Sequence, residues 1–187
     1  MNQDKIILDL CGGTGAWSLP YRDAGYNVRL ITLPEHDVRL YMPPENVHGI
    51  LAAPPCDHFA RVGARWWNVK GTQALLEGLS IVDACLRIIH RCKPAWWAIE
   101  NPTGRLKDYL GEPGYKFDPW WFGDAWTKRT WLWGDFNAPS KRPDVIRPLL
   151  IGTPGKRGRT VKMSSSWKVQ RSITPPCFAR AFFEANP

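Results

Sequence analysis

Four short apolar runs, separated by turns and helical segments, constrain the fold of this chain more than any other feature. The runs have the length of buried strands and occupy residues 5–10, 27–33, 48–54 and 95–100. A short helix is predicted after the first run, with Ser18 as its N-cap and its end near Gly25. Residues 72–92 carry apolar side chains at helical spacing. Strands that alternate with helices indicate an α/β protein with a mostly parallel sheet.

Side chains that could take part in a reaction lie where three of these runs end. Asp9 lies near the end of the first run, Cys56 follows the third, and Glu100 ends the fourth. The carboxyl ends of parallel strands meet at one edge of a sheet, where ligands bind. We therefore expect these three residues to fall on one edge although they are far apart in sequence.

The composition is typical of one globular domain. The chain has 187 residues, of which 44% are hydrophobic and 22% charged. No apolar run approaches the roughly 20 residues of a membrane span, and "MNQDKIILDL" lacks the basic-then-apolar layout of a signal peptide. The five cysteines show neither CxxC pairs nor disulfide-framework spacing. We expect a cytoplasmic protein with reduced thiols, no metal site and no membrane contact.

Charge and tryptophan content predict a nucleic-acid partner. The net charge is +8, and there are eleven tryptophans, several beside basic residues as in "ARWWNVK", "WTKRTW" and "SSSWKVQR". Basic side chains bind phosphates while aromatic faces stack on unpaired bases. The alternative is a tryptophan-rich core beneath a basic, solvated face.

Residues 137–171 differ from the rest of the chain because they are rich in Pro, Lys, Arg, Ser and Gly. This composition predicts a long basic loop inserted into a single domain of residues 1–187. After it, Thr174 is the predicted N-cap of a final helix with Pro175 at its first position. The predicted buried face of that helix contains Cys177, Phe178, Ala181 and Phe182.

The first strand leads into a glycine turn, "LDLCGGTGAWSL". Glycine lets backbone approach a ligand closely, so the turn is a candidate seat for a nucleotide-like cofactor. Its spacing is neither the G-x-G-x-x-G dinucleotide fingerprint nor a phosphate-binding loop ending in GKS or GKT. A plain tight turn is the alternative.

Cys56 is the candidate nucleophile. Two prolines fix the backbone just before it, and Arg61, Arg65 and Lys70 follow. A basic neighbourhood favours the thiolate, which is the nucleophilic form of cysteine. A buried, inert thiol is the alternative.

Glu100 is the candidate acid. It follows the aromatic pair Trp96-Trp97, whose rings would desolvate the carboxyl and favour its protonated form. A protonated carboxyl can donate a proton to a ring nitrogen. A glutamate that caps the following turn is the alternative.

Taken in order, these segments resemble the motifs of the DNA cytosine-5 methyltransferases. "ILDLCGGTGAWSL" resembles their S-adenosylmethionine loop, "GILAAPPCDHFA" their proline-cysteine nucleophile motif, and "WWAIENPTGRL" their Glu-Asn motif. "TKRTWLWG" resembles their basic substrate-contacting motif more loosely, and "ITPPCFARAFF" stands where their last cofactor motif would be. The resemblance covers nearly the whole chain. It implies a Rossmann-like, S-adenosylmethionine-dependent methyltransferase fold.

The resemblance implies a covalent mechanism on cytosine in DNA. Cys56 would attack carbon 6 while Glu100 stabilises the ring through nitrogen 3, which makes carbon 5 nucleophilic enough to accept a methyl group. Arg129 would hold the base or a neighbouring phosphate. The loop of residues 57–70 would close over a base flipped out of its stack.

Two further sets of residues are expected to bind ligands. Those assigned to S-adenosylmethionine are Asp9, Cys11, Gly13, Thr14, Gly15, Asp37, Val38 and Pro55. Those expected to contact nucleic acid are Arg61, Arg65, Trp66, Lys70, Lys128, Lys156, Arg157 and Arg159.

The sequence departs from the family in several places. The acidic residue that ends the second strand and binds the ribose is not evident in "ITLPEHD", and the family's Glu-Asn-Val reads Glu-Asn-Pro. Residues 137–171 are too few and too polar to form the family's separate target-recognition domain. We therefore expect weak sequence specificity, or a separate protein partner that supplies it.

Three other functions fit the same residues. The same chemistry on RNA or a free cytosine nucleotide would explain the missing domain, although a net charge of +8 favours a polymer. A module that binds nucleic acid or cofactor without catalysis is the second, and the joint presence of Cys56 and Glu100 argues against it. The third is a transferase that moves a different one-carbon group to the same carbon.

Overall fold

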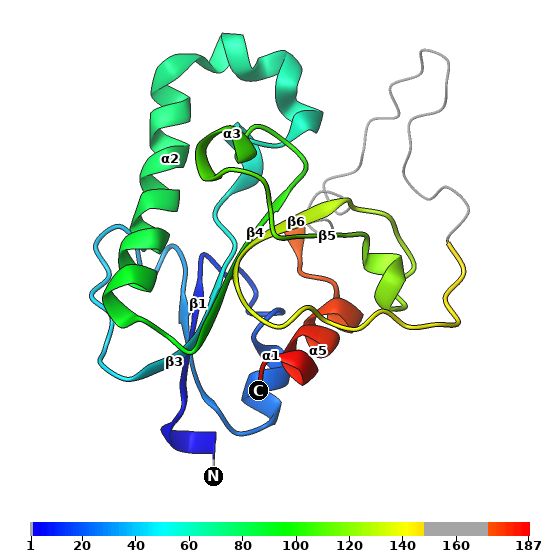
Figure 1. The fold of residues 1–187 in the computed structure, drawn as a ribbon. Coiled ribbons are helices and arrows are strands. Elements are labelled where there is room, and N and C mark those ends of the chain that lie inside the picture. The colour runs from blue at the N-terminus through cyan, green and yellow to red at the C-terminus, as the bar shows by residue number, and fades with distance from the viewer. Residues whose placement is uncertain (1, 148–171) are drawn as a thin grey trace.

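A computed structural model describes residues 2–147 and 172–187, which form an α/β fold (Figure 1). A six-stranded sheet with the strand order β2-β1-β3-β4-β6-β5 lies at its centre. The strands are β1 (Ile6–Leu10), β2 (Asn27–Ile31), β3 (Val47–Ala52), β4 (Trp96–Pro102), β5 (Tyr115–Phe117) and β6 (Thr130–Asp135). The four strands predicted from apolar runs are confirmed.

The four predicted strands form the parallel part of the sheet. β1 lies between β2 and β3, parallel to both, and β4 is parallel to β3. β1 reads IILDL and is almost entirely apolar, because both faces of a parallel sheet are covered. The chain leaves β1 for β2 on one side and then crosses to β3 on the other. Such a reversal of strand order opens a crevice at the carboxyl ends of the strands.

Two antiparallel strands, which the sequence did not predict, complete the sheet. β6 pairs with β4, and the edge strand β5 pairs with β6. Trp131 and Trp133 alternate along β6 and join one core cluster. Gly134 has φ +153, and a Cβ there would lie 2.1 Å from the Trp97 carbonyl oxygen. Glycine at this position therefore lets β6 approach β4 closely.

Helices cover both faces of the sheet (Figure 1). α1 (Leu19–Asp23) and α5 (Pro176–Ala185) lie on one face, and the long α2 (Trp67–Cys92) lies on the other. The core between the sheet and α5 is largely aromatic and contains Trp17, Tyr21, Trp96, Phe117, Phe122, Phe178 and Phe182. Several tryptophans are thus core residues, as the alternative interpretation of the composition required.

The connection from β3 to α2 is built from short helical turns. η2 (Cys56–His58) and η3 (Arg61–Trp66) lead into α2, which is kinked at Gly71 with φ 72° and ψ −176°. The regular part of α2 therefore begins at Thr72, as the helical spacing predicted. The other short elements are η1 (Asn2–Asp4), α3 (Lys107–Leu110) and η4 (Pro119–Phe122).

The start of α5 differs from its prediction. Pro175, not Thr174, occupies the N-cap position, and it has no side-chain group that could cap the helix. The Asp124 carboxylate instead accepts hydrogen bonds from the N–H groups of Cys177 and Phe178, each at 3.2 Å. A carboxylate at this end also interacts favourably with the helix dipole. The cap thus comes from a residue that local sequence could not identify.

The predicted buried face of α5 is partly confirmed. Phe178 and Phe182 are fully buried, and Ala179 is buried with them. Cys177 and Ala181 stay partly exposed and pack against the margin of the same cluster. The helix is therefore rotated slightly from its predicted orientation.

Part of the predicted basic loop lies outside the described residues, including Lys156, Arg157 and Arg159. Its first part, residues 137–147, contains no helix or strand. Within residues 2–147 and 172–187, no helix is long and apolar enough to cross a membrane.

Candidate active site

The carboxyl ends of β1, β3 and β4 meet at one edge of the sheet. In the parallel register Leu10 lies beside Ala52, and Ala52 lies beside Ile99. Asp9, near the end of β1, Cys56, just beyond β3, and Glu100, after Ile99, therefore fall on the same edge. This placement is the one that the sequence predicted.

Asp9 is a buried carboxyl at the base of the glycine turn. It is 0% exposed, and the Ser18 hydroxyl donates a hydrogen bond to Asp9 Oδ2 at 2.6 Å. Burial raises the pKa of Asp9 to about 6, although the bond from Ser18 opposes the rise. Ser18 occupies the N-cap position of α1 as predicted, but its side chain makes no capping bond to the helix. Its hydroxyl donates its hydrogen bond to Asp9 instead.

The glycine turn has the shape of a ligand seat. A Cβ on Gly12 would lie 2.2 Å from Asp9 Oδ1, so the turn rests directly on the buried carboxyl. Gly13 has φ +55, and a Cβ there would meet no atom within 4 Å. Asp9 Oδ1 has no hydrogen-bond partner among the described residues. An open glycine backbone over an unpaired buried oxygen fits a nucleotide-like cofactor. Gly15 has φ +71, and Thr14 is exposed on the same turn.

Asp9→Asn is expected to stabilise the protein at neutral pH much more than at acidic pH. The folded-state pKa of about 6 exceeds the ordinary value of 3.8, so the folded protein binds more protons than the unfolded chain between these values. The wild type therefore loses stability as the pH rises through this window, by about 1–3 kcal/mol. Urea unfolding of both proteins at about pH 4 and about pH 7.5 measures the change. An equal difference at the two pH values would contradict a raised pKa.

Three other residues assigned to the cofactor contact protein groups. Cys11 has φ +57, packs against the core beneath α2, and a hydrogen bond with Cys85 lowers its pKa. Asp37 binds Arg39, whose hydrogen bonds hold the pKa of Asp37 at about 2. Val38 is buried in the core that faces α2. Their role toward a cofactor stays a prediction.

Cys56 opens η2 directly after the exposed Pro55 and is half-buried. Burial raises the pKa of the Cys56 thiol, and the Glu100 charge adds to this rise. Lys128 opposes it by favouring the thiolate. Glu100 of β4 and Lys128, just before β6, therefore both act on the pKa of the thiol, and burial has a larger effect on it than either charge.

The prediction that Arg61, Arg65 and Lys70 favour a Cys56 thiolate is wrong in its net effect, because the pKa of Cys56 is raised. All three residues are exposed. Lys70 Nζ donates a hydrogen bond to the Asp57 carbonyl oxygen at 2.8 Å, and the Arg65 guanidinium lies 5.2 Å from the Trp66 ring centroid. Trp66 is 50% exposed. Basic and aromatic side chains thus face solvent here, an arrangement that suits single-stranded nucleic acid.

Lys128 is the basic side chain beside Glu100. Its Nζ lies 3.5 Å from Glu100 Oε1, and the two side chains are only 13% and 14% exposed. A pair with so little exposure is screened less by salt than a surface pair. Arg129 is exposed, and its charge acts on Asp118, where it opposes the rise in pKa caused by burial. Lys128, predicted only to contact nucleic acid, therefore lies beside the candidate acid Glu100.

Asn101 is a buried residue to which the sequence analysis gave no role. Its Nδ2 donates a hydrogen bond to the Pro54 carbonyl oxygen at 2.9 Å. This bond joins β4 to the turn that precedes Cys56. The position next to Glu100 in the Glu-Asn motif was the available signal, but it does not reveal the partner.

The segment that begins at Cys56 pairs with the loop that follows Glu100. We call residues 56–61 the nucleophile segment. Ala60 and Gly104 form an isolated antiparallel bridge. The Arg61 N–H donates to the Thr103 carbonyl oxygen at 2.8 Å. The two loops are therefore held together by backbone contacts that the sequence did not indicate.

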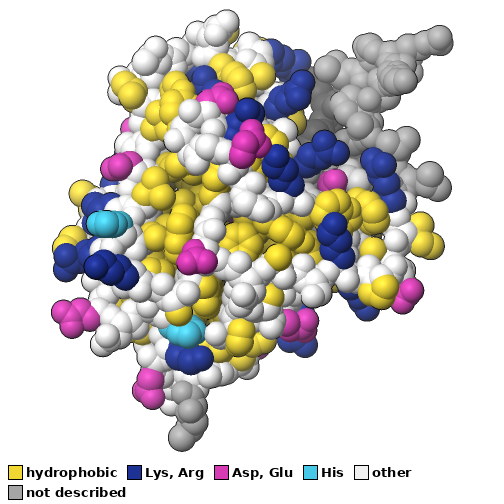
Figure 2. Space-filling model, in the orientation of Figure 1, with side chains coloured by type: hydrophobic (Ala, Val, Ile, Leu, Met, Phe, Trp, Pro, Cys, Tyr) yellow, Lys and Arg dark blue, Asp and Glu magenta, His cyan; other side chains and the backbone are white. Residues whose placement is uncertain are grey.

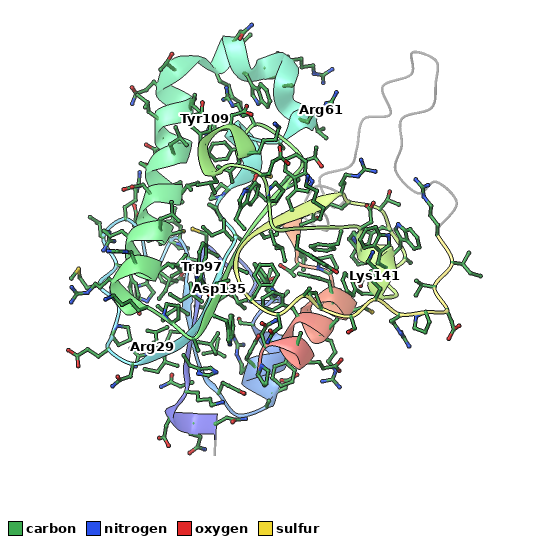
Figure 3. All side chains as sticks on the ribbon, in the orientation of Figure 1. Arg29, Arg61, Trp97, Tyr109, Asp135 and Lys141 are labelled. Carbon is green, nitrogen blue, oxygen red and sulfur yellow. The ribbon has the colours of Figure 1, made fainter. Side chains whose placement is uncertain are left out.

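A cavity of about 490 Å³ lies away from this site and is lined by Leu86, Ile89, His90, Lys93, Pro94, Trp97 and Asp135. Trp97 pairs with Asp135 across β4 and β6, at the end of β4 opposite Glu100. Figure 3 shows these two residues far from Arg61 of η3. Figure 2 shows a hydrophobic strip between α2 and the sheet. The cavity is therefore separate from the candidate active site.

Comparisons with known proteins support the fold. No protein-family model and no curated protein sequence matches this chain. Among solved structures, the chain is similar to a proposed DNA modification methyltransferase encoded within a prophage, from E. coli. The two are 14% identical, with a TM-score of 0.53, and the match covers 97% of this chain and 69% of that chain. At this identity the similarity shows a shared fold.

Proposed function

We propose that the protein is an S-adenosylmethionine-dependent methyltransferase that modifies carbon 5 of cytosine in DNA, on a single Rossmann-like domain of residues 1–187. One observation carries the proposal. Cys56 and Glu100 lie at the carboxyl edge of adjacent parallel strands, next to an open glycine turn at the end of β1. The fold shared with a proposed DNA modification methyltransferase supports it.

Cys56 and Glu100 divide the activation of the base between them. The Cys56 thiol loses its proton to solvent, and the thiolate forms a bond to carbon 6 of cytosine. The electrons of the 5,6 double bond form a double bond between carbons 4 and 5, and those of the bond between carbon 4 and nitrogen 3 move to nitrogen 3. Glu100 delivers a proton to nitrogen 3, so that the ring becomes a neutral enamine with a nucleophilic carbon 5. Once carbon 5 carries the methyl group, its proton passes to a water molecule, the electrons of that C–H bond reform the 5,6 double bond, and Cys56 leaves as the thiolate. The proton on nitrogen 3 then returns to Glu100.

Lys128 would support the Cys56 thiolate. It contacts Glu100 and favours the Cys56 thiolate against the effect of burial. In a site of low exposure, a fixed positive charge stabilises the negative charge that develops before proton transfer. Arg129 would hold the base or a neighbouring phosphate.

S-adenosylmethionine, when bound, supplies an electrophilic methyl group. The glycine turn would hold its methionine end, since the surface over Gly13 is open. Asp37 and Val38 would lie at its adenine, and Pro55 near the methyl group. Cys11 stands where the family has an aromatic residue.

DNA would contact the exposed basic and aromatic residues before the kink in α2. Arg61, Arg65, Trp66 and Lys70 are all exposed there. Because phosphate contacts release counterions, binding should weaken steeply with salt. Sequence specificity would be weak, or would come from a separate protein.

Covalent trapping tests this function. We expect wild-type protein with S-adenosylmethionine and DNA containing 5-fluorocytosine to give a shifted band on a denaturing gel, because fluorine cannot leave carbon 5 as a proton does. Cys56→Ala should give no shifted band, since it lacks the nucleophile. Cys92→Ala, at the end of α2, removes another partly buried thiol and should trap like the wild type.

Parallel reactions with single-stranded DNA, duplex DNA and RNA identify the substrate. An adduct with RNA alone would overturn the DNA assignment and keep the chemistry. No adduct with any of these, or an equal adduct in Cys56→Ala, would overturn the proposed mechanism.

A further inference from the structure

Arg105 lies where the nucleophile segment crosses the loop after β4. Its Nε donates a hydrogen bond to the His58 carbonyl oxygen at 2.7 Å. Its backbone N–H donates to the Phe59 carbonyl oxygen at 2.9 Å. One residue thus holds two consecutive carbonyl groups of the segment that begins at Cys56.

The same guanidinium also contacts the start of α2. Arg105 Cζ lies 4.4 Å from the Trp67 ring centroid, and Trp67 is the first residue of that helix. A planar guanidinium can stack on a ring while it donates hydrogen bonds in its own plane, which an ammonium group cannot do. Arg105 therefore joins the nucleophile segment, the beginning of α2 and the loop that follows Glu100.

Cys56 is held on both sides by residues from β4 and its following loop. On the strand side, Asn101 binds the carbonyl group of Pro54. On the far side, Arg105 binds the carbonyl group of His58, two residues beyond Cys56. The side chain at position 56 thus stands between two fixed points of backbone.

We propose that Arg105 is a positioning residue that fixes Cys56 relative to Glu100 before the substrate arrives. This inference deepens the proposed function and rests on it. Arg105 acts through the His58 carbonyl group and touches no reacting atom. Catalytic groups work only within about 0.5 Å of their productive geometry. A misplacement of about 1 Å can lower a rate by about 100-fold.

Arg105→Met tests the proposal, because it removes the charge and the hydrogen bond but keeps an unbranched aliphatic side chain. We expect the maximal rate of adduct formation to fall by about 100-fold, with an unchanged KM for S-adenosylmethionine. Iodoacetamide alkylation of Cys56, followed by peptide mass spectrometry, should become several-fold faster, because a released segment exposes the half-buried thiol. Arg105→Lys should restore part of the rate, since lysine can still donate to His58.

Two controls separate positioning from general loosening. Cys85 is fully buried, so its alkylation should stay slow in Arg105→Met. Tyr115→Phe removes a hydrogen bond of 3.1 Å to the Pro139 carbonyl oxygen at the edge of the sheet, and should leave both readouts of Cys56 unchanged. Faster alkylation of Cys85 together with Cys56 would overturn the proposal, as would unchanged Cys56 alkylation in Arg105→Met. If the wild type formed no adduct, the proposed function would fail, whereas the alkylation measurement would still decide the role of Arg105.

Discussion

Gly104→Ala is expected to destabilise the protein by about 3 kcal/mol and to slow adduct formation by about 100-fold. A Cβ at residue 104 would lie 1.9 Å from the Phe59 carbonyl oxygen. That oxygen belongs to the backbone and cannot rotate away, so the bridge between residues 60 and 104 has to open. Opening it frees the nucleophile segment from the loop that follows Glu100. Thermal unfolding and 5-fluorocytosine trapping measure the two losses.

Gly114→Ala is the matched control for this substitution. A Cβ at Gly114 would meet no atom within 4 Å, and its φ is not in the left-handed region. We expect a change in unfolding free energy within about 0.5 kcal/mol and normal trapping. If Gly104→Ala behaved in the same way, the two loops would not be as closely apposed as described.

Phe178→Ala is expected to cost about 3–5 kcal/mol of unfolding free energy. The Phe178 side chain is fully buried, and its ring stacks on Phe117 with centroids 4.1 Å apart and an interplanar angle of 18°. It also contacts Trp17, Phe122 and Phe182. These rings come from separate elements and constrain one another, so they cannot collapse into the space that the ring leaves. Urea denaturation of the two proteins measures the cost.

Leu40→Ala removes a side chain of comparable hydrophobicity that is 81% exposed. We expect it to change stability by no more than about 0.5 kcal/mol, because little area returns to water. A loss below about 1 kcal/mol in Phe178→Ala would show that the aromatic core adapts to the cavity.

The parallel part of the fold could be predicted because its signal is local. β1, β3 and β4 are buried on both faces, so their apolar runs stand out in the sequence. β5 is three residues long, and β6 has exposed residues at its end, so neither gives a clear pattern. The position of β6 depends on its pairing with β4, and that of β5 on its pairing with β6.

The candidate site was predicted in its residues but not in its supports. Asp9, Cys56 and Glu100 were identified because each lies near or just beyond the end of a recognisable apolar run. The carbonyl groups that Asn101 and Arg105 bind belong to Pro54 and His58, each 47 positions away in sequence. The raised pKa of Cys56 was missed for a similar reason: neighbours in sequence suggested a positive environment, whereas burial depends on the folded chain.

The hydrogen bond between Tyr21 and Asn186 joins two distant parts of the chain. The Tyr21 hydroxyl donates to the Asn186 carbonyl oxygen at 2.8 Å, across 165 positions of sequence. While the chain is being synthesised, the side of the Tyr21 ring that packs against Phe183 stays uncovered until α5 has left the ribosome. Contacts of such separation slow folding, and apolar surface left open meanwhile favours aggregation or chaperone binding. The part of α1 that meets α5 is therefore among the last parts of the core to be buried.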